Sequence, residues 1–309
     1  MNLVFPDRPE TQRLGPAGIM PGDIQSEEPM IPSQLEQDDI GLKALIPFVL
    51  LTFLIAWGIL GFYIFFNDAA VRLLGQISGT HPLFFLAVWA PAIAAVAVIL
   101  RGQGVAGLKC YLQRLRLWRI PPGWLLLILV GLPAVFFLGA LIKGAPLEAP
   151  ILAEGMGAVV ILMVLMLFLG PVEELGWRGL ALPVLQRYMA PVWAAVLIGA
   201  VWGFWHLPAF YLSGAVQSEW GFAPFFIGNI CLSLIVTPIF NASRGSILWP
   251  MLYHFQLINP LWPDAQPYDT YILIGVSALI LVLRREAMFS NRHACTVVIP
   301  SMTGSSGAV

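Results

Sequence analysis

The chain has 309 residues, of which 59% are hydrophobic and only 11% charged, and its mean hydropathy is +0.82. Soluble domains carry about 25% charged residues, so this composition excludes an ordinary soluble protein and indicates an integral membrane protein. A net charge of −1, without a basic patch interleaved with aromatic residues, gives no reason to expect a nucleic-acid partner. The three cysteines show no Cys-x-x-Cys spacing, which argues against a disulfide framework and a zinc knuckle.

Three regions differ in composition along the chain. Residues 1–40 are polar, rich in proline and acidic side chains, and lack the apolar core of a signal peptide, so we predict a disordered cytoplasmic arm. Residues 41–285 are the predicted transmembrane helical domain, and its motif-bearing core is 155–262. Residues 286–309 have no lipidation motif at their end and are predicted to be a cytoplasmic tail.

The apolar segments predict an all-α fold. A membrane-spanning helix needs about 20 mostly apolar residues, and on this measure the chain is a polytopic membrane protein with a bundle of about eight transmembrane helices around an intramembrane polar site. The predicted spans are Leu42–Phe66, Pro82–Leu100, Gly123–Ile142, Gly155–Gln186, Pro191–Leu207, Phe222–Phe240, Ser246–Leu261 and Tyr271–Leu283.

The fourth predicted span is too long for one straight crossing. A continuous helix from Gly155 to Gln186 would measure about 48 Å, against a hydrocarbon core of about 30 Å. Gly170-Pro171 lies mid-way, and proline breaks or kinks a helix interior. Irregular backbone at membrane depth must face protein or a water-filled cavity, so the residues after the break are expected inside the bundle.

Positive charge predicts the orientation, because short cytoplasmic loops are rich in lysine and arginine. The predicted loop after the second span is strongly basic, and alternation of the spans puts most other basic residues on the same side. We therefore expect both termini in the cytoplasm, in a multi-pass protein of a bacterial or archaeal cell membrane. The basic residues of this loop are Arg101, Lys109, Arg114, Arg116 and Arg119.

Ionisable side chains at membrane depth cost about 2.5 kcal/mol or more each, so they mark functional sites. Glu173, Glu174 and Arg178 follow an uninterrupted apolar run, and two histidines, His206 and His254, lie in later hydrophobic segments. Together they suit one kind of chemistry. A carboxylate takes a proton from water, one histidine holds that water, and a second histidine with an amide stabilises an oxyanion, as in peptide or ester hydrolysis.

Spacing assigns contacts within this set. Glu174 and Arg178 are i, i+4, so we expect an ion pair on one helical face. Glu173 points about 100° away and is available for chemistry. Trp202 and His206 have the same i, i+4 spacing, so the indole is expected to lie against the imidazole.

These residues, in this order, resemble the motifs of the CPBP (CAAX protease and bacteriocin-processing, or Abi) family of intramembrane proteases. Its motifs are Glu-Glu-x-x-x-Arg, then aromatic-x-x-x-His, then His-x-x-x-Asn. Glu173–Arg178 matches the first in full, and Trp202–His206 matches the second, with tryptophan where phenylalanine is commoner. In the third, His254 is followed by Ile258 at the asparagine position and by Asn259 one residue later.

The resemblance implies a hydrolase, a membrane-embedded CAAX-type protease that cleaves a peptide or protein substrate reaching the lipid bilayer. It implies Glu173 as the general base on water, with His206 as its partner. It implies His254 and Asn259 as the oxyanion hole. Because the asparagine is shifted by one residue, either Pro260 distorts the turn enough to bring Asn259 in or Gln256 substitutes for it. The supporting residues would be Glu174, Arg178 and Trp202.

The resemblance leaves the cofactor open, because the family has been described both as metalloproteases and as enzymes without an essential metal. Glu173, His206 and His254 could hold zinc or another divalent metal. No His-Glu-x-x-His helix pre-forms such a site, so we favour metal-independent chemistry.

Two other functions are compatible with the sequence. The shifted Asn259 favours a catalytically silent member of the family, an immunity or scaffold protein that binds a peptide or partner. A proton-coupled transporter would relay protons through the same glutamates and histidines. Transporters usually contain internal repeats, and the first half of this chain has no matching polar set.

Overall fold

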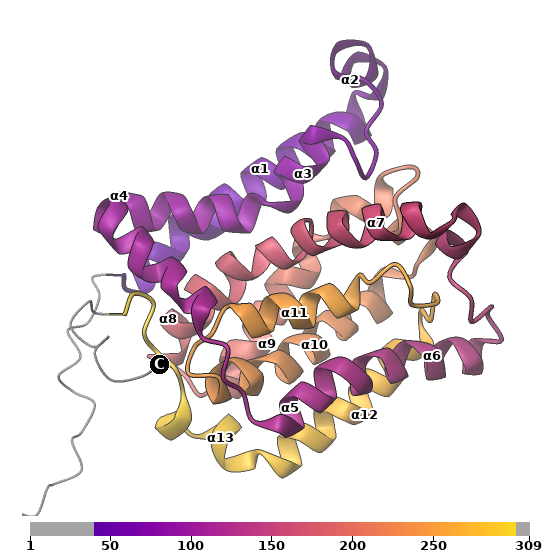
Figure 1. Cartoon of the computed structure of the whole chain (residues 1–309). Helices are drawn as coiled ribbons and strands as arrows, with labels where there is room; N and C mark the ends of the chain where they lie inside the picture. Colours follow the sequence, from indigo (N-terminus) through magenta and orange to yellow (C-terminus); the bar gives the residue numbers. More distant parts are fainter. Residues whose placement is uncertain (1–39, 301–309) are drawn as a thin grey trace, which may run out of the picture. The chain divides into compact units, whose positions relative to one another are not determined.

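The computed structural model describes residues 40–300, and within this range the regular secondary structure is helical, without strands (Figure 1). The all-α prediction is therefore confirmed. The predicted arm, apart from its last residue, and residues 301–309 of the predicted tail lie outside the described residues. The helices are α1 (Leu45–Phe65), α2 (Asn67–Leu74), α3 (Pro82–Val88), α4 (Ala90–Gln113), α5 (Pro122–Leu126), α6 (Leu132–Lys143), α7 (Met156–Phe168), α8 (Leu182–Gln186), α9 (Pro191–Trp205), α10 (Phe222–Ala242), α11 (Leu248–Leu257), α12 (Tyr268–Leu283) and α13 (Arg285–Phe289).

The number of spans differs from the expected eight. Six helical stretches of the described chain are long and apolar enough to cross a membrane. The last two predicted spans are shorter: α12 has 16 residues and α11 has 10, which gives α11 a length of about 15 Å. A polytopic membrane protein is confirmed, but a count of eight is not. The six stretches are Leu42–Phe65, Ala90–Arg116, Pro122–Lys143, Met156–Gln186, Pro191–Tyr211 and Phe222–Ala242.

The distribution of side chains is that of a protein in lipid. Large apolar side chains face outward along the long helices, as at Leu54 in α1, which is 71% exposed, and at Met156 in α7. Two charged side chains after the break in the fourth span lie inside instead: Glu174 and Arg178 are each only 1% exposed. Such an apolar exterior would be an aggregation liability in water and is favourable in a bilayer.

The expected break in the fourth span is present. α7 ends at Phe168, and a 3₁₀ turn, η6 (Pro171–Glu173), begins at the proline of the Gly170-Pro171 pair. A π-helical segment, η7 (Leu175–Ala181), then leads into α8. π-Helical turns are frequent at functional sites, and this one carries the residues just after the two glutamates.

The loop predicted after the second span is instead helical through Gln113. α4 bends at Gly104, where φ is +63°, a conformation that glycine adopts readily. Beyond the bend, α4 packs against η7, and Arg114 is buried rather than solvated as a cytoplasmic loop charge. The prediction of a loop was therefore wrong up to Gln113, whereas the side of the membrane stays a prediction. Main-chain carbonyls satisfy the guanidinium of Arg114 inside the protein, which hydropathy cannot reveal.

The helices that carry the site are held between neighbours. α10 packs against α9 and α12, α12 against α6, and α11 against η6. Residues 286–300, predicted as the start of a polar tail, include the fully buried Met288 and Val298. Met288 packs with Val192 of α9 and Leu234 of α10, so this part of the chain is integrated with the helices.

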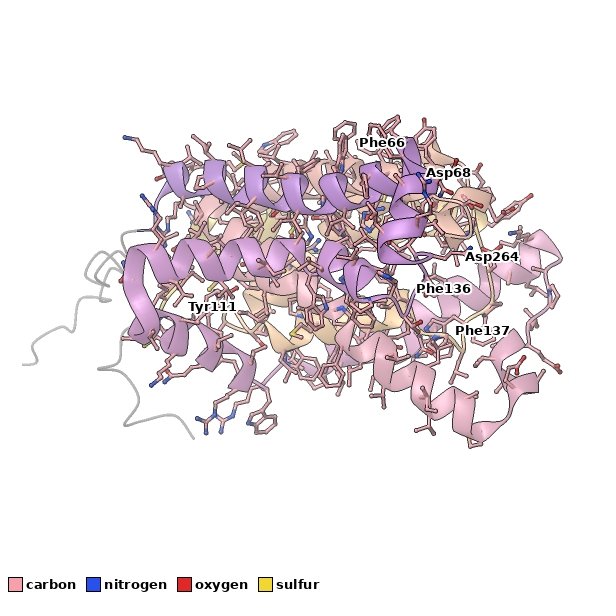
Figure 2. The ribbon with its side chains drawn as sticks, turned by 90° about the horizontal axis from the view of Figure 1, so that it is seen from above. Phe66, Asp68, Tyr111, Phe136, Phe137 and Asp264 are labelled. Atoms are coloured by element: carbon pink, nitrogen blue, oxygen red, sulfur yellow. The ribbon has the colours of Figure 1, made fainter. Side chains whose placement is uncertain are left out.

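Residues that are far apart in the sequence lie at the same end of the long helices. In Figure 2, Phe66, Asp68 and Asp264 lie toward one end and Tyr111 lies toward the other. Lys143 forms an ion pair of 2.6 Å with Asp264. The cytoplasmic location of the two termini stays a prediction.

Gly176→Ala is expected to destabilise the fold by about 1–3 kcal/mol, because overpacking against main chain is not easily relieved. The added methyl group would lie 2.6 Å from the main-chain oxygen of Pro91 in α4. Gly275→Ala in α12 is the matched control, since no atom lies within 4 Å of its added methyl group. Thermal unfolding of the purified protein in detergent measures both variants, and equal Tm values would contradict the close packing of α4 on η7.

Candidate active site

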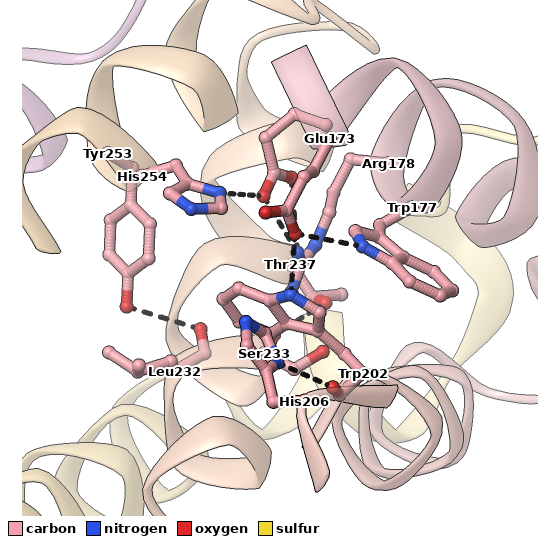
Figure 3. A network of polar contacts seen from close by, with 11 residues as sticks. Glu173, Trp177, Arg178, Trp202, His206, Leu232, Ser233, Thr237, Tyr253 and His254 are labelled. Carbon is pink, nitrogen blue, oxygen red and sulfur yellow. Dashed lines mark hydrogen bonds and ion pairs between the residues drawn. The ribbon is translucent and has the colours of Figure 1, made fainter. Parts of the chain in front are cut away.

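Buried polar side chains from three parts of the chain converge inside the helices (Figure 3). Glu173 ends the 3₁₀ turn η6, and Glu174 follows it immediately. α9 contributes Trp202 and, at its C-terminal end, His206, while α11 contributes His254. The structure thus brings together the glutamates and both histidines singled out in the sequence.

Glu174 is an acceptor shared by two cationic or ionisable side chains. Arg178 Nη1 donates to both carboxylate oxygens, at 3.0 and 3.1 Å, so the expected ion pair is confirmed. His254 Nδ1 lies 2.8 Å from Glu174 Oε1. Removing one partner of a buried ion pair is strongly destabilising, so this cluster ties α11 to the segment that carries both glutamates.

Glu173 has a different environment, because its partners are neutral. Its Oε2 accepts hydrogen bonds from Trp202 Nε1 at 2.9 Å and from Trp177 Nε1 at 3.4 Å. Its Oε1 takes no hydrogen bond from residues 40–300. The indoles orient the carboxylate and leave one oxygen available. Trp177 was not singled out in the sequence, although its i, i+4 spacing from Glu173 was the available signal.

Trp202 lies at the centre of the cluster. The guanidinium carbon of Arg178 is 4.9 Å from the centre of its ring, within cation–π range. The ring centroids of His206 and His254 lie 5.7 and 5.4 Å from it, so the expected contact between Trp202 and His206 is confirmed. One indole therefore contacts every ionisable group of the cluster except Glu174.

The hydrogen bonds of the histidines define which ring nitrogen is available. His206 Nδ1 lies 2.8 Å from the carbonyl oxygen of Trp202, which can only accept, so this nitrogen carries the proton and Nε2 is the acceptor in the neutral ring. His254 uses Nδ1 for Glu174, and its Nε2 faces Gly170. A side chain at residue 170 would begin 2.7 Å from that nitrogen, so glycine there leaves room for the imidazole.

Asn259 makes its hydrogen bonds outside the cluster. α11 ends at Leu257, and Asn259 caps the following turn by accepting from Leu261 N at 3.0 Å. Its Nδ2 donates to Gln256 Oε1 at 3.2 Å, and Gln256 Nε2 donates to Ile128 O. Within the described chain, neither amide is bonded to the glutamates or histidines.

The donors do not fit the metal site considered from the sequence. Among residues 40–300, no three His, Cys, Asp or Glu side chains lie close enough together to hold one metal ion. No step described below depends on a metal.

The side chains of the cluster can carry proton transfer with water. A buried carboxylate with an available oxygen, an imidazole acceptor and a second imidazole paired with a carboxylate suit acid–base hydrolysis. An all-α membrane bundle enclosing such a set is the architecture of a membrane-embedded hydrolase.

Comparisons with known proteins agree with this class. Residues 155–257 match the family model described as Type II CAAX prenyl endopeptidase Rce1-like. The chain is also 26% identical over 255 residues to the CAAX prenyl protease 2 of Methanococcus maripaludis, an alignment that covers 74% of this chain and 92% of the relative. Both comparisons support the CPBP family of CAAX-type membrane proteases that the motifs predicted, and both names indicate a protease, which is a hydrolase.

Arg178→Ala is expected to destabilise the protein by about 3–5 kcal/mol, because it leaves the buried Glu174 with only His254 as a partner. Arg292→Ala is the matched control: it removes the Arg292–Glu286 pair, whose Arg292 side chain is 79% exposed, and should change little. The yield of folded protein and its Tm in detergent measure both variants. Equal losses would contradict the structural role of the buried pair.

Proposed function

We propose that this protein is an intramembrane endopeptidase that cleaves a peptide bond near the membrane with a water molecule activated by Glu173. The observation that carries the proposal is the Glu173 carboxylate itself. It is buried, held through Oε2 by two indole N–H groups, and its Oε1 takes no hydrogen bond from the described part of the chain. A carboxylate in this state is a suitable general base.

In the proposed first step, Glu173 Oε1 takes a proton from water while the water oxygen attacks the carbonyl carbon of the peptide bond. His206 presents Nε2 as an acceptor, because its Nδ1 donates to Trp202 O. That acceptor would hold the second hydrogen of the water and orient its lone pair. The tetrahedral intermediate then collapses: the C–N bond breaks, the carbonyl reforms, and the proton on Glu173 passes to the leaving amine nitrogen, which completes hydrolysis.

The oxyanion that forms needs a donor. Paired with Glu174, a protonated His254 would present Nε2–H as that donor, and a positioned donor stabilises charge that develops in the transition state. Asn259 is the second proposed donor. It would have to exchange its hydrogen bond with Gln256 for one with the oxyanion.

The proposed substrate is the C-terminal region of a peptide or protein held at the bilayer by a prenyl group. The names of the family model and of the relative from Methanococcus maripaludis both support this class. We further propose that both termini are cytoplasmic, as the basic segment around Arg116 and Arg119 favours.

Glu173→Gln is expected to lower kcat by about 10²- to 10⁴-fold, because the amide cannot take the proton from water. The matched control is Glu154→Gln, an exposed glutamate outside the cluster, which should retain activity. Mass spectrometry of peptide termini in membranes with wild type or variant measures cleavage of native proteins. A synthetic peptide ending in Cys-aliphatic-aliphatic-x, with and without a farnesyl thioether, measures the prenyl requirement.

The outcomes of this comparison are distinct. Products that vanish in Glu173→Gln and persist in Glu154→Gln support the proposed base, and retained cleavage in Glu173→Gln removes it. Identical peptide profiles for folded wild type and Glu173→Gln would indicate a silent binding protein instead. Equal cleavage of both synthetic peptides would contradict the prenyl requirement alone.

Trp202→Phe is expected to lower kcat by about 10- to 100-fold, the effect of losing one hydrogen bond to a charged group. Phenylalanine keeps an aromatic ring between the histidines but removes the N–H donor 2.9 Å from Glu173. Trp262→Phe is the matched control, because the Trp262 N–H has no hydrogen-bond partner in the described chain. Cleavage assays on both purified variants provide the measurement, and equal kcat values would show that the donor to Glu173 is dispensable.

A further inference from the structure

Arg114 is a buried arginine, 2% exposed, that follows the last turn of α4. Its guanidinium donates to main-chain oxygens in three distant parts of the chain: Gly179 at 2.7 Å, Gly245 at 2.8 Å and Val298 at 3.0 Å. Its own main-chain oxygen accepts from Ile247 N at 3.3 Å. Arg114 thus bridges segments that lie up to 184 positions from it in the sequence.

These segments are the ones that carry the candidate active site. Gly179 follows Arg178 directly in η7, the segment that continues from the two glutamates. Gly245 and Ile247 form the turn that leads into α11, the helix of His254. The bridge through Arg114 therefore joins the two elements whose side chains meet in the Glu174–His254 contact.

Tyr111, one turn earlier in α4, makes a second attachment to η7. Its hydroxyl donates to the main-chain oxygen of Leu175, the residue after Glu174. Gly179 allows this approach, because any side chain at that position would overlap the Tyr111 hydroxyl. The hydrogen-bond ladder of a π-helix differs from that of an α-helix, and side-chain donors from Tyr111 in α4 and from Arg114 just after it bind the carbonyls of Leu175 and Gly179 in this one.

The chemistry of the bridge requires arginine. A guanidinium is a planar fork whose donors point in fixed directions, so it can bind several carbonyls at defined angles. Lysine at this position would supply a compact ammonium that cannot reproduce this geometry. Charge-assisted hydrogen bonds are also stronger than neutral ones, which makes the spacing between the bridged segments stiff.

We infer that Arg114 and Tyr111 are positioning residues for the hydrolysis: they hold the glutamate segment and α11 at the separation that the Glu174–His254 contact needs. Neither residue bonds to the glutamates or histidines in the described chain; they act through the main chain of Leu175, Gly179 and Gly245. The inference rests on the proposed function for its catalytic consequence. Its structural part, the placement of His254, is independent of any substrate.

The first test is the kinetics of Arg114→Lys in the full-length protein. We expect kcat to fall about 10- to 100-fold, because small misplacements of catalytic groups lower the rate by such factors. KM should stay within about twofold of wild type. Arg187→Lys is the matched control. Arg187 also donates to main-chain oxygens, those of Thr296 and Ile40, but neither acceptor lies in the glutamate segment or in the turn before α11. Its kcat should be unchanged.

The second test does not need a substrate. In protein labelled with ¹⁵N-histidine, the His254 Nδ1 resonance reports the contact with Glu174, and His254→Ala assigns it among the four histidines. We expect this resonance to shift in Arg114→Lys and to stay in place in Arg187→Lys. A mild variant, Tyr111→Phe, removes only the hydroxyl and should shift the resonance and lower kcat to a smaller extent.

Wild-type kcat and an unshifted His254 resonance in folded Arg114→Lys would overturn the inference. If Arg114→Lys does not fold, the same two measurements are made on Tyr111→Phe. Wild-type kcat and an unshifted His254 resonance in that variant would overturn the inference. Failure of the proposed function is a separate result: wild type would cleave no peptide, or Glu173→Gln would cleave as well as wild type. In that case the His254 resonance alone decides whether Arg114 and Tyr111 position α11.

Discussion

The rest of the site depends on one electrostatic constraint, the burial of the Glu174 carboxylate among apolar helices. A charge in such surroundings is stable only with close partners, and Glu174 has two, Arg178 and His254. These partners fix α11 against the glutamate segment. They also place the Arg178 guanidinium on the Trp202 ring, whose N–H in turn holds Glu173. The position of the proposed base therefore follows from the pairing of its neighbour.

Adjacent glutamates consequently have different roles. Both oxygens of Glu174 are engaged, by Arg178 and His254, so Glu174 acts as a structural anchor, whereas Glu173 is held by neutral indoles through a single oxygen. A base must keep an oxygen available for water, and only Glu173 meets this condition. The same division would let the cluster be rigid and still reactive, because the side chains that hold the helices together are distinct from the proposed base.

The bilayer imposes a constraint on this arrangement that explains the contacts of its irregular backbone. Main-chain groups at membrane depth need partners inside the protein, so an irregular segment such as η6 and η7 persists only where other elements satisfy it. Here Tyr111 and Arg114 supply donors to the carbonyls of Leu175 and Gly179. Glycine at residue 176 permits the close approach of α4 that this requires. The buried arginine thus supplies hydrogen-bond donors that the irregular backbone needs at membrane depth.

The sequence by itself determined the class of the protein, the break at Gly170-Pro171, and the contacts Glu174–Arg178 and Trp202–His206. Hydropathy indicates whether a segment lies in lipid or in water, and i, i+4 spacing places two side chains on one helical face. Both are local properties of the sequence. Only the tertiary structure decided the number of long spans, the burial of Arg114, the hydrogen bonds of Asn259 to residues outside the cluster, and the pairing of His254 with Glu174, 80 positions away. These depend on how helices pack and which buried polar groups find partners, a property of the assembled bundle that no local pattern contains.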